Sequence, residues 1–62
     1  MFVRIVYHSP EGTKGHLLGC RDKADMFDRL TAARIAVSQV ERIAVREAGD
    51  KWEEKEIAYL KS

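Results

Sequence analysis

The sequence has few of the features that stabilise secreted domains or anchor proteins in a membrane. Cys20 is the single cysteine, so the internal disulfides that small secreted domains commonly need cannot form. No apolar run approaches the ~20 residues that span a bilayer. Residues 1–7 also lack the long apolar core and the small-residue cleavage site of a secretory signal. We therefore expect a soluble, cytoplasmic protein that has no membrane partner.

The sequence also has no excess of positive or negative charge. Lysine and arginine number 11 and aspartate and glutamate 10, which leaves a formal net charge of +1 without a basic arm or an acidic tail. Nucleic-acid backbones are normally bound by clustered cations that release counterions. The even distribution of charge therefore argues against a partner held mainly by electrostatics.

Motifs for catalysis, metal binding or cofactor binding are absent from the sequence. The closely spaced glycines between residues 12 and 19 belong to a predicted hairpin, whereas phosphate-binding glycine loops open a helix. His8, His16 and Cys20 are predicted to share one face of that hairpin, but a strand rises ~3.3 Å per residue, which places its ends too far apart for one metal ion. We expect no enzyme activity, no metal or cofactor, and no small-molecule substrate.

The residues that are present predict a small α+β domain. Hydrophobic residues make up 45% and charged residues 34% of the chain, which is a globular composition. Alternating β-branched and aromatic side chains predict a strand over 2–8. Ser9-Pro10-Glu11-Gly12 predicts a type I turn with a glycine bulge, so that a loop over 10–12 leads into a second strand over 13–20.

This loop determines which residues of the two strands lie opposite each other. We expect His8 opposite Lys14, Val6 opposite His16, and Arg4 opposite Leu18. The face turned towards the core then carries Val3, Ile5, Tyr7, Gly15, Leu17 and Gly19. The second face carries Phe2, Arg4, Val6, His8, Lys14, His16, Leu18 and Cys20. The second face is therefore a mixture of apolar and cationic side chains.

A helix is predicted over 22–36, after the hairpin. Asp22 can cap its start, and Asp25 and Arg29 are spaced to form an ion pair on its flank. Its apolar stripe is formed by Met26, Phe27, Leu30, Ala33 and Val37. We expect this stripe to cover the core face of the hairpin.

The C-terminal part allows alternatives at two places. Residues 40–47 fit a strand with Ile43 and Val45 inward, which we prefer, or the continuation of one long helix to Gly49. Residues 51–60 fit a strand that follows a hairpin turn, or a helix that follows a capping box. The preferred hairpin gives a single domain over 1–62 in the order ββαββ.

The second face of the hairpin is the candidate functional site, because arginine and aromatic anchors around an apolar centre are typical of protein interfaces. We predict that a partner protein, or a second copy of the chain, contacts Phe2, Arg4, Val6, His8, Lys14, His16 and Leu18. One alternative is a nucleic-acid surface that uses Arg4, Lys14, Arg42 and Arg46, with Phe2 as its one aromatic residue. Another is that the C-terminal segment covers the face through Trp52, Ile57 and Tyr59.

In size and order of elements, the chain resembles the small α+β proteins of phages and mobile elements that bind and inhibit a host protein. The resemblance covers the whole chain and rests on architecture rather than on particular residues. It implies a non-enzymatic interaction or regulatory module.

Overall fold

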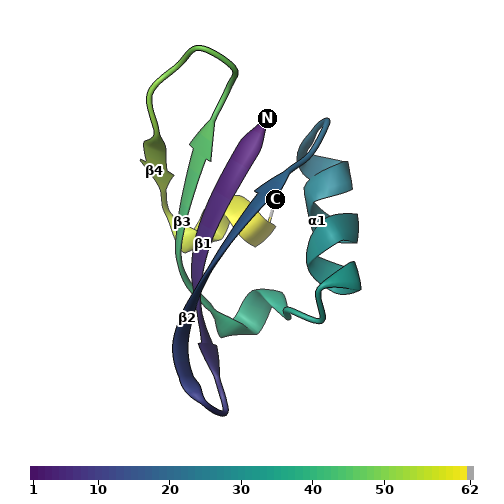
Figure 1. The fold of residues 1–62 in the computed structure, drawn as a ribbon, viewed down its shortest axis with the longest axis vertical. Coiled ribbons are helices and arrows are strands. Elements are labelled where there is room, and N and C mark those ends of the chain that lie inside the picture. The colour runs from purple at the N-terminus through teal and green to yellow at the C-terminus, as the bar shows by residue number, and fades with distance from the viewer. Residues whose placement is uncertain (62) are drawn as a thin grey trace.

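The computed structural model describes residues 1–61 and shows an antiparallel sheet with helix α1 packed on one of its faces (Figure 1). The elements in chain order are β1 (Phe2–Ser9), β2 (Gly12–Gly19), α1 (Lys23–Ala32), η1 (Val37–Gln39), β3 (Val40–Arg46), β4 (Glu53–Lys55) and η2 (Ile57–Lys61). The strands lie in the order β2-β1-β3-β4. The predicted α+β class is confirmed. The ββαββ order is matched only in outline, because the 3₁₀ helix η1 lies between α1 and β3 and a second one, η2, follows β4.

The predicted register of the first hairpin is wrong by one residue. Arg4 lies opposite Leu17, where Leu18 was expected. The loop consists of residues 10 and 11 alone, because Gly12 already pairs with Ser9. Gly12 takes a φ of +119°, and the Ser9 hydroxyl closes the turn by donating to the Gly12 carbonyl at 2.7 Å. A shift of one residue turns every side chain of β2 to the other face of the sheet.

Burial of apolar surface explains this register. Leu18 is 8% exposed and packs in the core with Cys20, which follows β2, whereas Leu17 is 63% exposed. The expected register would have buried Leu17 between two glycines, and so would have removed less apolar surface from water. The pairing also extends beyond β2, because the Cys20 N–H donates to the Met1 carbonyl at 2.9 Å.

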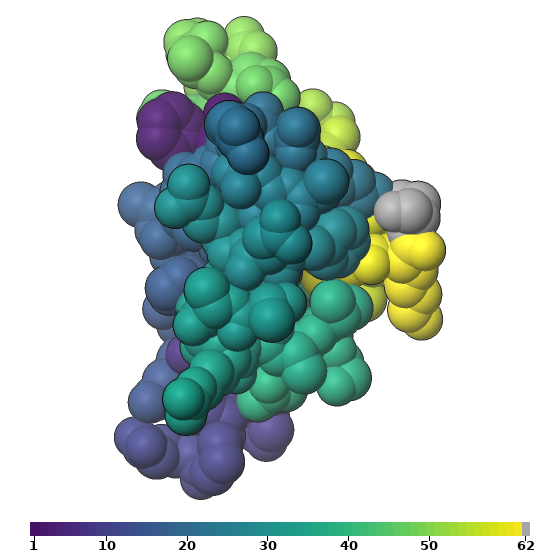
Figure 2. Space-filling model, turned by 90° about the vertical axis from the view of Figure 1, so that its right-hand side faces the viewer, coloured from purple at the N-terminus to yellow at the C-terminus, as the bar shows by residue number. Residues whose placement is uncertain are grey.

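The core lies between the sheet and α1. Its most deeply buried side chains are Val3, Ile5, Met26, Leu30 and Ile43. Figure 2 views the molecule from the helix side and shows α1 over the sheet, with η2 beside it. The inward positions predicted for β1 and for the first turns of the helix are therefore confirmed.

Helix α1 begins as predicted. Asp22 Oδ1 accepts a hydrogen bond from the Asp25 N–H at 2.8 Å and caps the first turn. Asp25 Oδ2 accepts from the Arg21 N–H at 2.9 Å and lies 3.5 Å from Arg29 Nε, which is the expected ion pair. The Arg21 N–H and the neighbouring guanidinium groups hold the pKa of the Asp25 carboxyl below its usual value.

Helix α1 ends at Ala32, short of the predicted residue 36. Arg34 adopts a left-handed conformation with φ +60°. Its N–H donates to the Thr31 carbonyl at 3.0 Å, and the Ile35 N–H donates to the Leu30 carbonyl at 2.9 Å. This pair of bonds is the Schellman motif, which normally places glycine at the left-handed position. The chain therefore reverses here, and Ile35 returns to pack in the core with Leu30.

Strand β3 confirms the preferred interpretation of residues 40–47 and excludes the single long helix. Ile43 and Val45 are buried as expected. A β-bulge opposite Val6 and Tyr7 adds one residue to β3, so that Val40 and Ile43 both point inward. No helix within residues 1–61 is long and apolar enough to cross a membrane.

The C-terminal segment combines both alternatives considered for residues 51–60. Strand β4 completes a hairpin with β3, and the helical turn η2 follows it. Ile57, Tyr59 and Leu60 pack with the core, and Lys23 Nζ of α1 lies 4.0 Å from the centroid of the Tyr59 ring. The alternative in which the C-terminal segment covers the second face is therefore wrong for Ile57 and Tyr59, whereas Trp52 does lie against that face.

Candidate functional site

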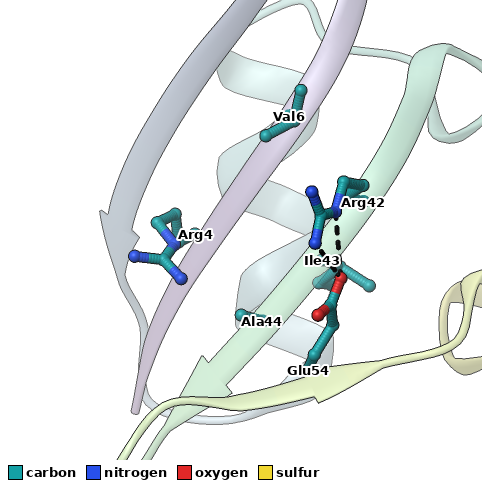
Figure 3. Close-up of a pocket in the computed structure, with 6 residues that line it drawn as sticks. All are labelled: Arg4, Val6, Arg42, Ile43, Ala44 and Glu54. Carbon is teal, nitrogen blue, oxygen red and sulfur yellow. Dashed lines mark hydrogen bonds and ion pairs between the residues drawn. The ribbon is translucent and has the colours of Figure 1, made fainter.

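The face of the sheet opposite α1 is the candidate functional site, because α1 and η2 both pack on the core side and leave this face open (Figure 3). We call it the outer face. The strand pairings assign it Phe2, Arg4, Val6 and His8 of β1, Thr13, Gly15, Leu17 and Gly19 of β2, Arg42, Ala44 and Arg46 of β3, and Glu54 of β4. Trp52, just before β4, joins it through contacts with Arg4 and Arg46.

The predicted binding residues are divided between the two faces of the sheet. Phe2, Arg4, Val6 and His8 lie on the outer face, as expected. Lys14, His16 and Leu18 lie on the core side of β2, because the register differs from the prediction. Leu18 is a core residue. Leu17 takes its place on the outer face, directly opposite Arg4.

A row of aromatic and arginine side chains crosses one end of the outer face. Phe2 pairs with Gly19 on one side and with Arg46 on the other. Its ring lies over Gly19, 3.8 Å from the position that a Cβ would take there. The Arg46 guanidinium carbon is 5.3 Å from the centroids of both the Phe2 and the Trp52 rings. Ring and cation contacts thus connect three strands and the segment before β4.

Arg46 is held by these rings rather than by hydrogen bonds. Its Nε is buried and has no hydrogen-bond partner within residues 1–61. An unsatisfied buried donor costs about 1–3 kcal/mol. Cation–π contacts contribute about 0.5–2 kcal/mol each, so the two ring contacts offset much of that cost.

A pocket of about 240 Å³ opens on the outer face beside this row. It is lined by Arg4, Val6, Arg42, Ile43, Ala44 and Glu54 (Figure 3). Arg42 donates to Glu54 Oε1 through Nε at 2.9 Å and through Nη2 at 2.8 Å. Arg4 instead places its guanidinium carbon 4.9 Å from the centroid of the Trp52 ring, and no carboxylate of residues 1–61 pairs with it.

His8, His16 and Cys20 do not share a face, so that part of the prediction is wrong. His8 is on the outer face, where its Nδ1 lies 3.6 Å from Glu41 Oε1, while His16 is on the core side. No group of three His, Cys, Asp or Glu side chains within the described chain is placed to hold a metal ion. Burial raises the pKa of the Cys20 thiol, which keeps it protonated and poorly nucleophilic at neutral pH.

From the sequence, Arg42, Arg46 and Trp52 were named only as alternatives to the predicted site, and Ala44 and Glu54 were not named at all. Arg42, Ala44 and Arg46 alternate with buried residues, so their outward direction follows from the strand pattern. The pattern does not indicate that β3 pairs with β1, and it is this pairing that brings these side chains beside Arg4 and Phe2.

No protein-family model, curated protein or solved structure matches the chain. The assignment of a function therefore depends on the geometry of the outer face.

Proposed function

We propose that the chain is a non-enzymatic interaction module that binds a partner protein through the outer face of its sheet. The observation that carries the proposal is the presence of exposed apolar side chains, Phe2 at 39% and Leu17 at 63%, beside Arg4 and Trp52 on an open face. Aromatic and arginine side chains dominate the binding energy of protein interfaces.

The outer face is also supported by pairing and by ring contacts. β1 forms its centre and is paired along both sides, and the Phe2–Arg46–Trp52 row fixes the side chains at one end. A surface that is already ordered loses less conformational entropy when a partner binds. The outer face therefore favours a partner with a complementary, partly apolar surface.

Peptide selection tests this proposal. A random peptide library displayed on phage is selected against the immobilised protein, and the dissociation constants of the selected peptides are measured with the wild type and with Leu17→Ser. Burial of a leucine is worth about 1.5–3 kcal/mol, so we expect Leu17→Ser to weaken binding roughly tenfold. The control is Ala32→Ser, which introduces a serine at an exposed position of α1 away from the outer face and should not change the affinity. Peptides that bind Leu17→Ser as tightly as the wild type would contradict the proposal.

The position of Trp52 favours a second candidate function, the binding of single-stranded nucleic acid. Bases stack on aromatic rings while cations neutralise phosphates, and Trp52 adds a second aromatic residue to the face that holds Arg4, Arg42 and Arg46. Lys14, the fourth expected cation, lies on the core side. Binding of oligothymidylate through these arginines would weaken with salt, with a slope of roughly −2 in log K against log salt concentration. Absence of binding at low salt would exclude this function.

Self-association through the free edge of β2 is a variant of the protein-binding proposal. β2 is eight residues long, contains no proline and pairs with β1 along one side, so its other side offers backbone groups to a further strand. An inhibitor of a host protein, the class that the chain resembles in size and order of elements, would use the same face or edge. Sedimentation equilibrium over a range of concentrations tests the variant, because a mass that stays monomeric excludes it.

A further inference from the structure

The pocket on the outer face combines apolar and cationic linings in a way that suits one negatively charged side chain. Val6 and Ala44 contribute apolar surface, and Arg4, Arg42 and Glu54 contribute charge. Figure 3 shows Arg4 and Arg42 projecting from neighbouring strands, with Glu54 meeting Arg42 from β4. The pocket is therefore bounded by one arginine that already holds a carboxylate and by one that does not.

The Arg42–Glu54 pair shows how this face accommodates a carboxylate. One carboxylate oxygen of Glu54 accepts two hydrogen bonds from the Arg42 guanidinium, at 2.9 and 2.8 Å. Both side chains are more than half exposed, at 67% and 59%. Charge-assisted bonds of this kind thus form at the surface of the pocket without burial.

Arg4 has the same chemistry but no carboxylate of its own. Its guanidinium carbon lies 4.9 Å from the centroid of the Trp52 ring, and such a contact with the ring face uses none of its N–H donors in a hydrogen bond. None of these donors forms a hydrogen bond within residues 1–61. Its neighbours across the strands are the exposed Leu17 and the small Ala44. Arg4 is thus open to a ligand and lies next to an apolar contact.

We propose that Arg4 receives a single carboxylate, the side chain of an aspartate or glutamate in a partner protein, while a bulky apolar residue next to it in the partner covers Leu17. The inference rests on the proposed function and names the chemistry of the segment that the outer face recognises. The partner segment combines one acidic and one large apolar side chain.

The charges around the pocket favour a protein carboxylate over a nucleic-acid backbone. Glu54 lines the pocket, and Glu41 lies beside His8 near the other end of the face. These carboxylates repel any further negative charge, and the repulsion grows with the number of phosphates that a nucleic-acid strand brings, whereas a partner side chain brings one charge. The pairing of Glu54 with Arg42 also reduces the cationic charge available for a phosphate track. A lone carboxylate needs only the donors of Arg4, which form a planar fork.

Titrations followed by ¹⁵N NMR test the inference with defined probes. The labelled protein is titrated with the dipeptide acetyl-Leu-Glu-amide and, in parallel, with acetyl-Leu-Gln-amide, which has the same shape without the charge. We expect the glutamate peptide to shift the Arg4 Nε–H signal and the Leu17 and Ala44 amides. It should bind roughly threefold more tightly than the glutamine peptide, which is within the range for an exposed ion pair.

Variants of Arg4 show whether the preference depends on its guanidinium. Arg4→Gln should abolish the preference for glutamate, and Arg4→Lys, which keeps the charge but loses the fork, should retain part of it. Arg21→Gln removes an exposed arginine from the turn before α1 and should leave the preference intact. Loss of the preference in Arg21→Gln as well would overturn the inference, because it would show an effect of net charge alone.

The outcomes separate this inference from the proposed function. If both dipeptides shift the outer-face amides equally, the outer face binds peptides but Arg4 is not a carboxylate site, and only the inference fails. If neither shifts the outer face and no peptide selected from the library depends on Leu17, the proposed function fails. Larger, salt-sensitive shifts of the same signals with oligothymidylate would overturn the inference in favour of phosphate binding.

Discussion

Leu17 and Leu18 are adjacent in β2 and have opposite environments, one exposed at 63% and the other buried at 8%. We expect Leu18→Ser to lower the free energy of unfolding by about 2–4 kcal/mol, because it removes a core side chain and leaves a cavity. Leu17→Ser should change it by less than about 0.5 kcal/mol, as is usual at the surface. Urea denaturation followed by circular dichroism measures both values. Equal losses in the two variants would show that the register of β2 is not the one described.

At the scale of single residues, the inward positions of β1 were predictable and those of β2 were not. Val3 and Ile5 alternate with outward residues, so the sequence predicts them correctly. In β2, Leu17 and Leu18 are both apolar, and either can serve as the inward residue. The choice depends on the Ser9 hydroxyl, which closes a shorter loop, and on Cys20, which gains burial in the core. Both effects come from residues outside the Leu17-Leu18 pair, so the two leucines alone do not indicate the register.

At the scale of elements, the end of α1 depends on an unusual residue. Arg34 holds the left-handed position of the Schellman motif, which costs a residue with a Cβ about 1–2 kcal/mol. Glycine loses more entropy on folding, so we expect Arg34→Gly to raise the free energy of unfolding by a net amount of about 0.5–1 kcal/mol. Arg34→Ala is the matched control, because it removes the same charge and keeps the Cβ. A glycine variant no more stable than the alanine variant in thermal or urea denaturation would contradict the assigned backbone conformation.

The same position explains why the sequence predicts a helix that is too long. Helix ends are usually recognised by glycine or proline, and the segment from Ala32 to Val37 contains neither. The start of α1, in contrast, was predictable from the cap at Asp22. β3 was predictable because the inward Ile43 and Val45 alternate with Arg42, Ala44 and Arg46. The charged residues of β4 left both a strand and a helix open.

At the scale of the whole molecule, we expect stability to fall in acid partly through Asp25. The folded pKa of Asp25 lies below the unfolded value of 3.8, mainly because the carboxylate accepts the Arg21 N–H. Its contribution to stability is therefore fully present above that value and is lost as the pH falls through the folded pKa. Asp25→Asn keeps a hydrogen-bond acceptor without the titrating charge, so its free energy of unfolding should depend less steeply on pH below 4 than that of the wild type. Parallel pH profiles for the two proteins in urea denaturation would contradict this assignment.

The arrangement of the whole sheet accounts for the part of the candidate site that the sequence did not reveal. Periodicity predicts which side of its own strand a residue faces, but it does not predict which strands are neighbours. β3 returns to pair with β1, and so it brings Arg42 and Arg46 next to the hairpin residues. The β1 part of the outer face was therefore predictable from the sequence, whereas the β2 part required the observed register of the hairpin and the β3 and β4 part required the order β2-β1-β3-β4.

The two borders of the sheet also differ in a way that limits how chains can assemble. β4 is three residues long, and Glu53, Glu54 and Lys55 are all charged, which discourages further pairing. β2 is long and largely uncharged. If two chains paired along β2, neither would keep a free β2 border, which is the one border of the described fold that is suited to pairing. Growth would stop at a closed twofold pair, so the design of the sheet disfavours filaments even at high concentration.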